Sequence, residues 1–194
     1  MKKNKKIKGE PGYFRYRKKK LLAGSLSGFL LMFLFFFTGY LIYGTARNLI
    51  TILAVLVVLP TVKIYVQYIM IPWKNNADAE YFNKIKNKFQ YIDIYAELLI
   101  TGSEKSFEIT YLAIDKNENI IAYTENDKAD ASKFEKAVTN FLNYYNYNAK
   151  VKMYNNLNSF EEKLTEISDM AAEPTNEQKE HMGVVFEKIS IMSI

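Results

Sequence analysis

Four carboxylates are the side chains of this sequence whose type and spacing come closest to catalytic chemistry. Glu108, Asp115, Glu118 and Glu125 lie in or beside three stretches with the composition of consecutive β-strands. Carboxylate oxygens hold Mg²⁺, and a bound metal ion can activate water against a phosphoester. Acidic residues are also common at solvated strand ends, and we favour that interpretation. We therefore assign no catalytic residue, no cofactor-binding residue and no metal ligand.

The composition excludes most other catalytic centres. The chain has 0 Cys and 1 His, which leaves no thiolate nucleophile, no disulfide and no multi-histidine metal site. That histidine, His181, lies on a predicted helix with no Ser or Asp placed to complete a triad, so we interpret it as a surface residue. An enzyme is thus the less favoured class of protein.

Charge is divided unevenly along the 194 residues. Residues 1–73 contain twelve of the 26 basic and one of the 21 acidic residues, which gives this part a formal charge of +11. Residues 74–194 hold the other 14 basic and 20 acidic residues and carry −6. An acidic C-terminal part is poorly suited to bind a polyanion, so nucleic acid is an unfavoured partner.

Two apolar stretches in the basic part predict a transmembrane helical hairpin. Residues 21–43 contain no charged side chain, and a helix needs roughly 20 apolar residues to cross a bilayer. A second stretch, 49–71, follows after a connection of five residues, which is long enough only to reverse the chain. We predict a polybasic arm over 1–20, a hairpin over 21–73 and a cytosolic domain over 74–194.

The basic arm predicts the orientation of this hairpin. Cytoplasmic flanks of membrane spans are enriched in Lys and Arg, and the connection between the spans has only Arg47. Both termini are therefore predicted to be cytoplasmic in a multi-pass protein of the cell (plasma) membrane. Each cation near an anionic leaflet contributes on the order of 1 kcal/mol to the attraction between the arm and the membrane. The alternative ligand of the basic arm is RNA. The residues assigned to anionic lipid are Lys2, Lys3, Lys5, Lys6, Lys8, Arg15, Arg17, Lys18, Lys19 and Lys20.

Two further sets of residues in the hairpin have predicted roles. We assign three residues to the membrane–water interface at the end of the second span: Lys63, Tyr68 and Trp73. The Lys63 side chain is long enough for its ammonium group to reach the interface. The alternative is that Lys63 is a charge buried in the membrane with a role in transport. Gly24 and Gly28 form a GxxxG spacing, which lets helix backbones approach closely. This close approach can occur between the protein's own two helices or between two copies of the chain. The sequence therefore does not decide between packing within the hairpin and a homodimer.

Periodicity predicts an α+β domain after the hairpin. A helix is predicted over 78–91, an antiparallel meander of strands over 94–101, 107–114 and 119–125, and a fourth strand over 150–154. Residues 92–101 also fit a helix. Capping boxes beginning at Ser132, Ser159 and Thr175 predict the starts of three more helices. The predicted order is α-β-β-β-α-β-α-α, with helices packed against one sheet.

That order resembles the core of metal-dependent nucleases of the restriction-endonuclease-like class. Those enzymes carry an acidic residue on the second strand and a Glu-x-Lys pair on the third. Here Lys128 lies three residues beyond Glu125, which does not place the two on the same face of a strand. A membrane-tethered nuclease or phosphoesterase with a degenerate core of this class is the alternative function.

A second resemblance covers most of the chain. The opening Gly9-Glu10-Pro11-Gly12-Tyr13, the run 16–20, the two spans and the segment 98–107 (LLITGSEKSF) resemble a family of small two-span membrane proteins from Gram-positive bacteria. The resemblance implies the two-span topology and a bacterial membrane protein. It implies no activity, no cofactor and no catalytic residue.

These observations predict a cytosolic interaction or regulatory domain that is anchored in the lipid bilayer. A membrane surface raises the effective concentration of other membrane-bound proteins, which is a reason to tether a small domain that performs no chemistry. The predicted partners are the bilayer, its anionic lipids and a protein that the sequence does not identify. A subunit of a larger membrane complex is a third possibility.

Overall fold

The chain forms two compact units. The computed structural model describes residues 6–72, 77–102, 105–169 and 173–193. One unit is the helical hairpin from Phe14 onward to residue 72. The other combines the described residues up to Tyr13 with those from Ala77 onward. The second unit is therefore discontinuous in sequence, with the hairpin inserted into it, whereas the sequence alone had suggested a separate N-terminal arm.

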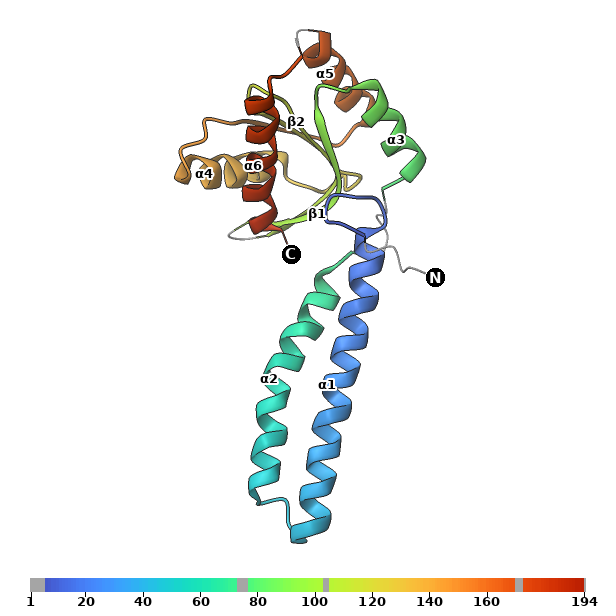
Figure 1. The fold of residues 1–194 in the computed structure, drawn as a ribbon, viewed down its shortest axis with the longest axis vertical. Coiled ribbons are helices and arrows are strands. Elements are labelled where there is room, and N and C mark those ends of the chain that lie inside the picture. The colour runs from blue at the N-terminus through green and yellow to red at the C-terminus, as the bar shows by residue number, and fades with distance from the viewer. Residues whose placement is uncertain (1–5, 73–76, 103–104, 170–172, 194) are drawn as a thin grey trace. The chain divides into compact units, whose positions relative to one another are not determined.

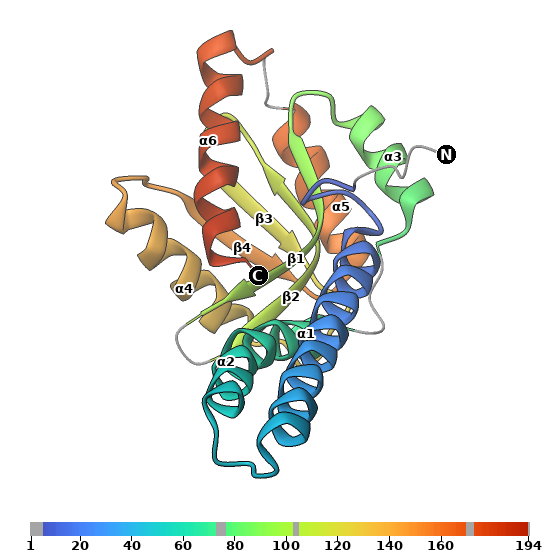
Figure 2. The ribbon, with the colours of Figure 1, turned by 60° about the horizontal axis from the view of Figure 1, so that its bottom comes forward.

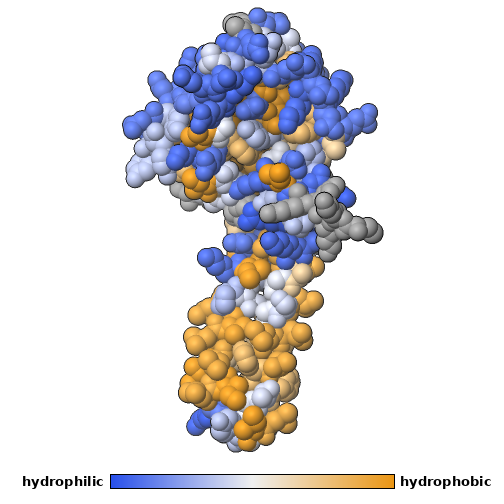
Figure 3. All heavy atoms as spheres, in the orientation of Figure 1, coloured by the Kyte–Doolittle hydropathy of each residue, from blue (hydrophilic) through white to orange (hydrophobic). Residues whose placement is uncertain are grey.

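Two long helices form the hairpin. They are α1 (Tyr13–Tyr43) and α2 (Leu49–Met70) (Figure 1). The side chain of Asn48 caps α2 by accepting a hydrogen bond from the amide of Thr51. Both helices are long and apolar enough to cross a membrane. Many of their apolar side chains are exposed, and the exposed fraction reaches 80% at Leu41 and 69% at Leu59. Figure 3 shows that the surface of the hairpin is mostly hydrophobic.

The discontinuous unit is an α+β domain around a four-stranded mixed sheet. In chain order, its helices and strands are α3 (Ala79–Lys88), β1 (Asp93–Thr101), β2 (Ser106–Ile114), β3 (Asn119–Tyr123), α4 (Ala131–Tyr144), β4 (Lys150–Tyr154), α5 (Leu157–Asp169) and α6 (Asn176–Met192). The strand order is β1-β2-β3-β4, antiparallel except that β4 runs parallel to β3. The predicted order of elements and the predicted meander are confirmed. Of the ambiguous residues 92–101, those from Asp93 to Thr101 form a strand rather than a helix.

Helices cover both faces of the sheet. Phe134, Val138 and Leu142 of α4 pack with α6 on one face, in one hydrophobic cluster. Phe82 of α3 and Phe160 of α5 belong to a second cluster on the other face. Figures 1 and 2 show α4 and α6 on one side of the strands and α3 and α5 on the other. Strands β1, β2 and β3 are therefore buried on both faces over most of their length, which explains their nearly continuous apolar residues. In β4, buried Val151 and Met153 alternate with exposed lysines.

The first two strands exchange faces at the position where their pairing is interrupted. Ile94 and Ala96 belong to the α3/α5 cluster, but Leu98, two residues on, belongs to the α4/α6 cluster. Glu97 lies between them with a left-handed φ of 53°. β2 switches in the same way at Thr110, and the register is unchanged on either side of this pair. The alternation of 92–100, which predicts a single apolar face, is wrong beyond Ala96 because this backbone distortion reverses the pleat.

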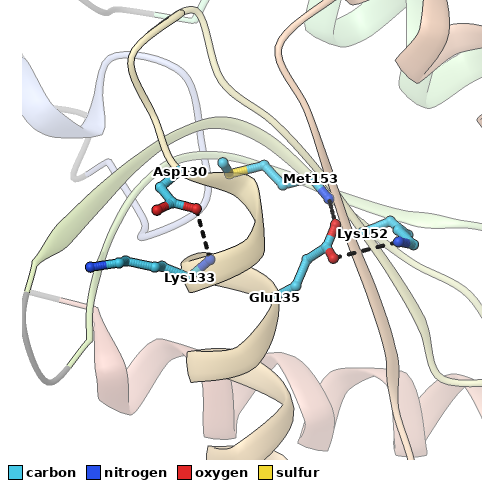
Figure 4. Close-up of polar contacts among 5 residues, drawn as sticks. All are labelled: Asp130, Lys133, Glu135, Lys152 and Met153. Carbon is cyan, nitrogen blue, oxygen red and sulfur yellow. Dashed lines mark hydrogen bonds and ion pairs between the residues drawn. The ribbon is translucent and has the colours of Figure 1, made fainter.

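Two of the three predicted capping boxes are wrong. Asp130, not Ser132, caps α4 by accepting from the amide of Lys133 at 3.1 Å, as Figure 4 shows. Asn156, not Ser159, accepts from the first amides of α5. The box at Thr175 is confirmed, with both reciprocal hydrogen bonds present. Asp, Asn and Ser are about equally favoured as caps, and Asp130 and Asn156 lie two and three residues upstream of the predicted serines, so each helix begins earlier than the serine indicated.

Candidate functional site

The four carboxylates that suggested metal chemistry do not come together. Glu108 lies near the start of β2 and Asp115 follows its end, so about seven residues of extended chain, roughly 23 Å, separate them. Glu118 lies in the turn before β3, and Glu125 is exposed beyond the other end of that strand. In the described residues no three His, Asp or Glu side chains are grouped as metal ligands.

Each of these acidic side chains has its own local environment. Asp115 is buried and accepts hydrogen bonds from the amides of Asn117 and Asn119 and from the Asn119 side chain. It therefore holds the β2–β3 turn, and its interpretation as a solvated strand end is wrong. Burial raises the pKa of Glu108. The exposed His181 lies with Nε2 3.5 Å from Glu118 Oε1.

The basic residues assigned to lipid contact divide between the two units. Lys2, Lys3 and Lys5 lie outside the described residues. Lys6 and Lys8 belong to the α+β unit. Lys8 Nζ donates to the carbonyl oxygens of Ser190 at 2.7 Å and Ser193 at 2.6 Å, where α6 ends. Lys8 thus stabilises the C-terminal end of α6, a role that a helix dipole favours for a cation.

The remaining basic residues lie on the first two turns of α1. Arg15, Lys19 and Lys20 are exposed and Arg17 is partly exposed. Lys18 is buried within the hairpin, where Nζ donates to the carbonyl oxygen of Ile71 at 2.8 Å and lies 5.4 Å from the ring centroid of Tyr68. Lys18 therefore joins the base of α1 to the end of α2.

The other predicted hairpin residues occupy distinct positions. Lys63 is exposed on α2, and Trp73 lies outside the described residues. Gly28 faces α2, where a Cβ atom would lie 2.8 Å from Thr61 Cγ2. At Gly24 a Cβ atom would make an ordinary contact of 3.6 Å with Ile64. The GxxxG spacing therefore packs against the protein's own second helix.

Glu97 is a buried carboxylate that the sequence did not indicate as a site residue. It contacts the two segments of the α+β unit that flank the hairpin in the sequence. Glu97 is 1% exposed. Its Oε1 accepts hydrogen bonds from the amide of Gly12 at 2.7 Å and from the amide of Ala77 at 3.1 Å. Gly12 precedes α1, and Ala77 follows α2 in the sequence. One carboxylate thus fixes the chain where it leaves the domain and where it returns.

The segment before α1 lies along the outer edge of β1. The amide of Ala96 donates to the carbonyl oxygen of Gly9 at 2.7 Å. Gly9 has a φ of 92° and lies over the stacked rings of Tyr95 and Phe186, whose centroids are 3.5 Å apart. A Cβ atom at Gly9 would lie 2.9 Å from Tyr95 Cδ1. We call Gly9, Gly12, Ala77 and Glu97 the insertion clasp.

Two features of the sequence could have indicated the insertion clasp. Glu97 is the one charged residue in the run 94–101, and a lone carboxylate in an otherwise apolar strand requires hydrogen-bond donors. The motif Gly9-Glu10-Pro11-Gly12 is typical of a tight, ordered turn rather than a free basic arm. Neither feature identifies the other as its partner, because they lie 85 residues apart in the chain.

Comparison of the chain with known protein families, with curated proteins and with solved structures found no match. The resemblance to a Gram-positive two-span family therefore stays a prediction, and the function has to be argued from the chain itself.

Proposed function

We propose that the protein is a membrane-anchored interaction module, with its hairpin in the bilayer and its α+β domain in the cytosol. The observation that carries the proposal is the insertion of an apolar, widely exposed hairpin into a domain with a well-packed core. Exposed apolar surface on this scale requires a cover, and lipid covers helices whose backbone hydrogen bonds are internal.

The insertion clasp supports an anchoring role for the hairpin. Glu97 binds the amides of Gly12 and Ala77, so the residues that flank the hairpin in the sequence belong to the folded α+β unit. A domain tethered to a membrane meets other membrane-bound proteins at a raised effective concentration. This arrangement suits recruitment or regulation of a partner in the same membrane.

The partner is sought with a tagged full-length chain that is crosslinked in cells. One comparison chain keeps the domain but carries an unrelated two-helix hairpin in place of residues 21–71, and another contains residues 1–73 alone. We expect the same protein to be recovered with the full chain and with the substituted hairpin, and not with residues 1–73. Recovery by residues 1–73 would assign binding to the hairpin, and absence of any enriched protein would contradict an interaction module.

A further inference from the structure

A groove of about 430 Å³ lies on the hairpin where its two helices are connected. Leu49, Ile52 and Val55, on the first turns of α2, contribute its apolar part. Each of these side chains is more than half exposed. The three residues follow one another at a spacing of three, so they form an apolar strip that runs from the connection along the helix.

Arg47 lies at the connection end of this strip. It is the only charged residue between positions 21 and 62, and residues 11–77 contain no Asp or Glu. A guanidinium stays protonated in proteins, so this charge has no acidic side chain within the hairpin to pair with. Its counter-ion has to come from outside the hairpin.

The connection holds the backbone on both sides of Arg47. The amide of Arg47 donates to Thr45 Oγ1 at 3.2 Å, and Asn48 Nδ2 donates to the carbonyl oxygen of Thr45 at 2.7 Å. Gly39 of α1 leaves room for Asn48, because a Cβ atom there would lie 2.7 Å from Asn48 Oδ1. The base of the Arg47 side chain is therefore fixed beside the groove.

We propose that this groove binds one anionic phospholipid, with the phosphate on Arg47 and an acyl chain on Leu49, Ile52 and Val55. We call these four residues the tip groove. The inference rests on the proposed function, because it takes the hairpin to lie in a bilayer. Arginine pairs with phosphate through two parallel hydrogen bonds. Phosphatidylglycerol offers that phosphate without an ammonium group of its own, whereas the choline of phosphatidylcholine competes with the guanidinium.

The test measures lipid contact at one position of the full-length protein by fluorescence quenching. The chain has 1 Trp, so W73F removes the background and V55W places a single tryptophan on the strip. Position 55 lies six residues, about 9 Å, along α2 from Leu49, at the depth of an acyl chain. Bromine atoms on acyl chains quench a tryptophan that they touch. The matched control F37W is exposed on α1, six residues before Tyr43, and α1 contributes no described residue to the groove.

The protein is reconstituted in symmetric vesicles of phosphatidylcholine and phosphatidylglycerol, with bromine on one lipid at a time. Symmetric vesicles make the result independent of the direction of insertion. At position 55 we expect phosphatidylglycerol to be preferred about fivefold. R47Q should reduce this preference to about one, R47K should leave an intermediate value because lysine lacks the planar fork, and K63Q should change nothing. At position 37 the preference should be close to one in every variant.

The tip groove is refuted if position 55 shows no preference for phosphatidylglycerol, or if R47Q leaves that preference unchanged. Equal preferences at positions 55 and 37 would also refute it, since they would indicate a general attraction of anionic lipid to the connection. These results leave the membrane hairpin intact, because both brominated lipids still quench. If neither brominated lipid quenches at either position, the hairpin is not in the bilayer, and the proposed function fails together with this inference.

Discussion

Replacement of Glu97 by alanine should release the segment before α1 from the domain. The substitution removes the acceptor of two amide hydrogen bonds, from Gly12 and Ala77. A hydrogen bond to a charged group contributes about 1.5–3 kcal/mol, and two of them about 3–6 kcal/mol. Because the variant no longer has to desolvate a carboxylate, we expect a net loss of about 3 kcal/mol, which is roughly a 150-fold change in an opening equilibrium.

Hydrogen–deuterium exchange of the full-length protein in detergent, read by mass spectrometry, measures this opening. In the wild type the peptide that covers residues 6–13 should exchange slowly, because Gly12 and its neighbours are held against β1. In E97A the same peptide should exchange faster by about two orders of magnitude. A peptide from β3 should be unchanged, which controls for global unfolding.

Two further substitutions separate the carboxylate from the backbone at this position. E97Q keeps an oxygen that can accept both amides, so we expect a loss of only about 1 kcal/mol. E97G loses the acceptor but relieves the left-handed φ of 53°, which costs a side chain about 1–2 kcal/mol. E97G should therefore be more stable than E97A. Equal exchange of residues 6–13 in E97A and the wild type would refute the clasp.

The remaining predictions concern glycines and the partly buried Tyr81. G9A should lower the thermal unfolding midpoint of the domain, because the new Cβ atom would lie 2.9 Å from a ring atom of Tyr95 and the backbone φ is 92°. G183A is the matched control, because Gly183 lies in open space on α6. It should stabilise the domain by up to about 1 kcal/mol in the same thermal unfolding measurement. G28A should lower the thermal stability of the hairpin in detergent more than G24A, which makes only an ordinary contact; equal midpoints would contradict the packing. Burial and the hydrogen bond to the Glu161 carboxylate raise the pKa of Tyr81. The contribution of Tyr81 to folding stability is therefore complete below about pH 10 and is lost as the pH rises further. Y81F should weaken this alkaline loss of stability in a circular dichroism titration, and a pH profile identical to that of the wild type would refute the assignment.

Much of the fold follows from local pattern in the sequence. Residues 21–43 and 49–71 are apolar without interruption by acidic residues. Helix α2 covers nearly the second range, whereas α1 ends with the first range but begins eight residues before it, in the predicted basic arm. The predicted strand at 150–154 matches β4, because Val151 and Met153 alternate with lysines. In each case the structure depends on neighbours in sequence, which periodicity reports directly.

The parts that could not be predicted depend on contacts between distant residues. The exchange of faces at Glu97 is matched by one at Thr110, where the β1–β2 ladder is interrupted, and neither strand shows this match by itself. Glu97 itself alternates in the sequence like an exposed strand residue, yet it is buried because Gly12 and Ala77 supply donors from outside the sheet.

Single-cysteine labelling tests the central claim most directly, because the chain has 0 Cys and each introduced thiol is unique. A46C places a thiol in the exposed connection between the two helices, and S132C places one on the exposed start of α4. With a membrane-impermeant maleimide on intact cells, we expect A46C to be labelled and S132C to be labelled only after permeabilisation. Labelling of S132C on intact cells would contradict a membrane hairpin that holds its domain in the cytosol.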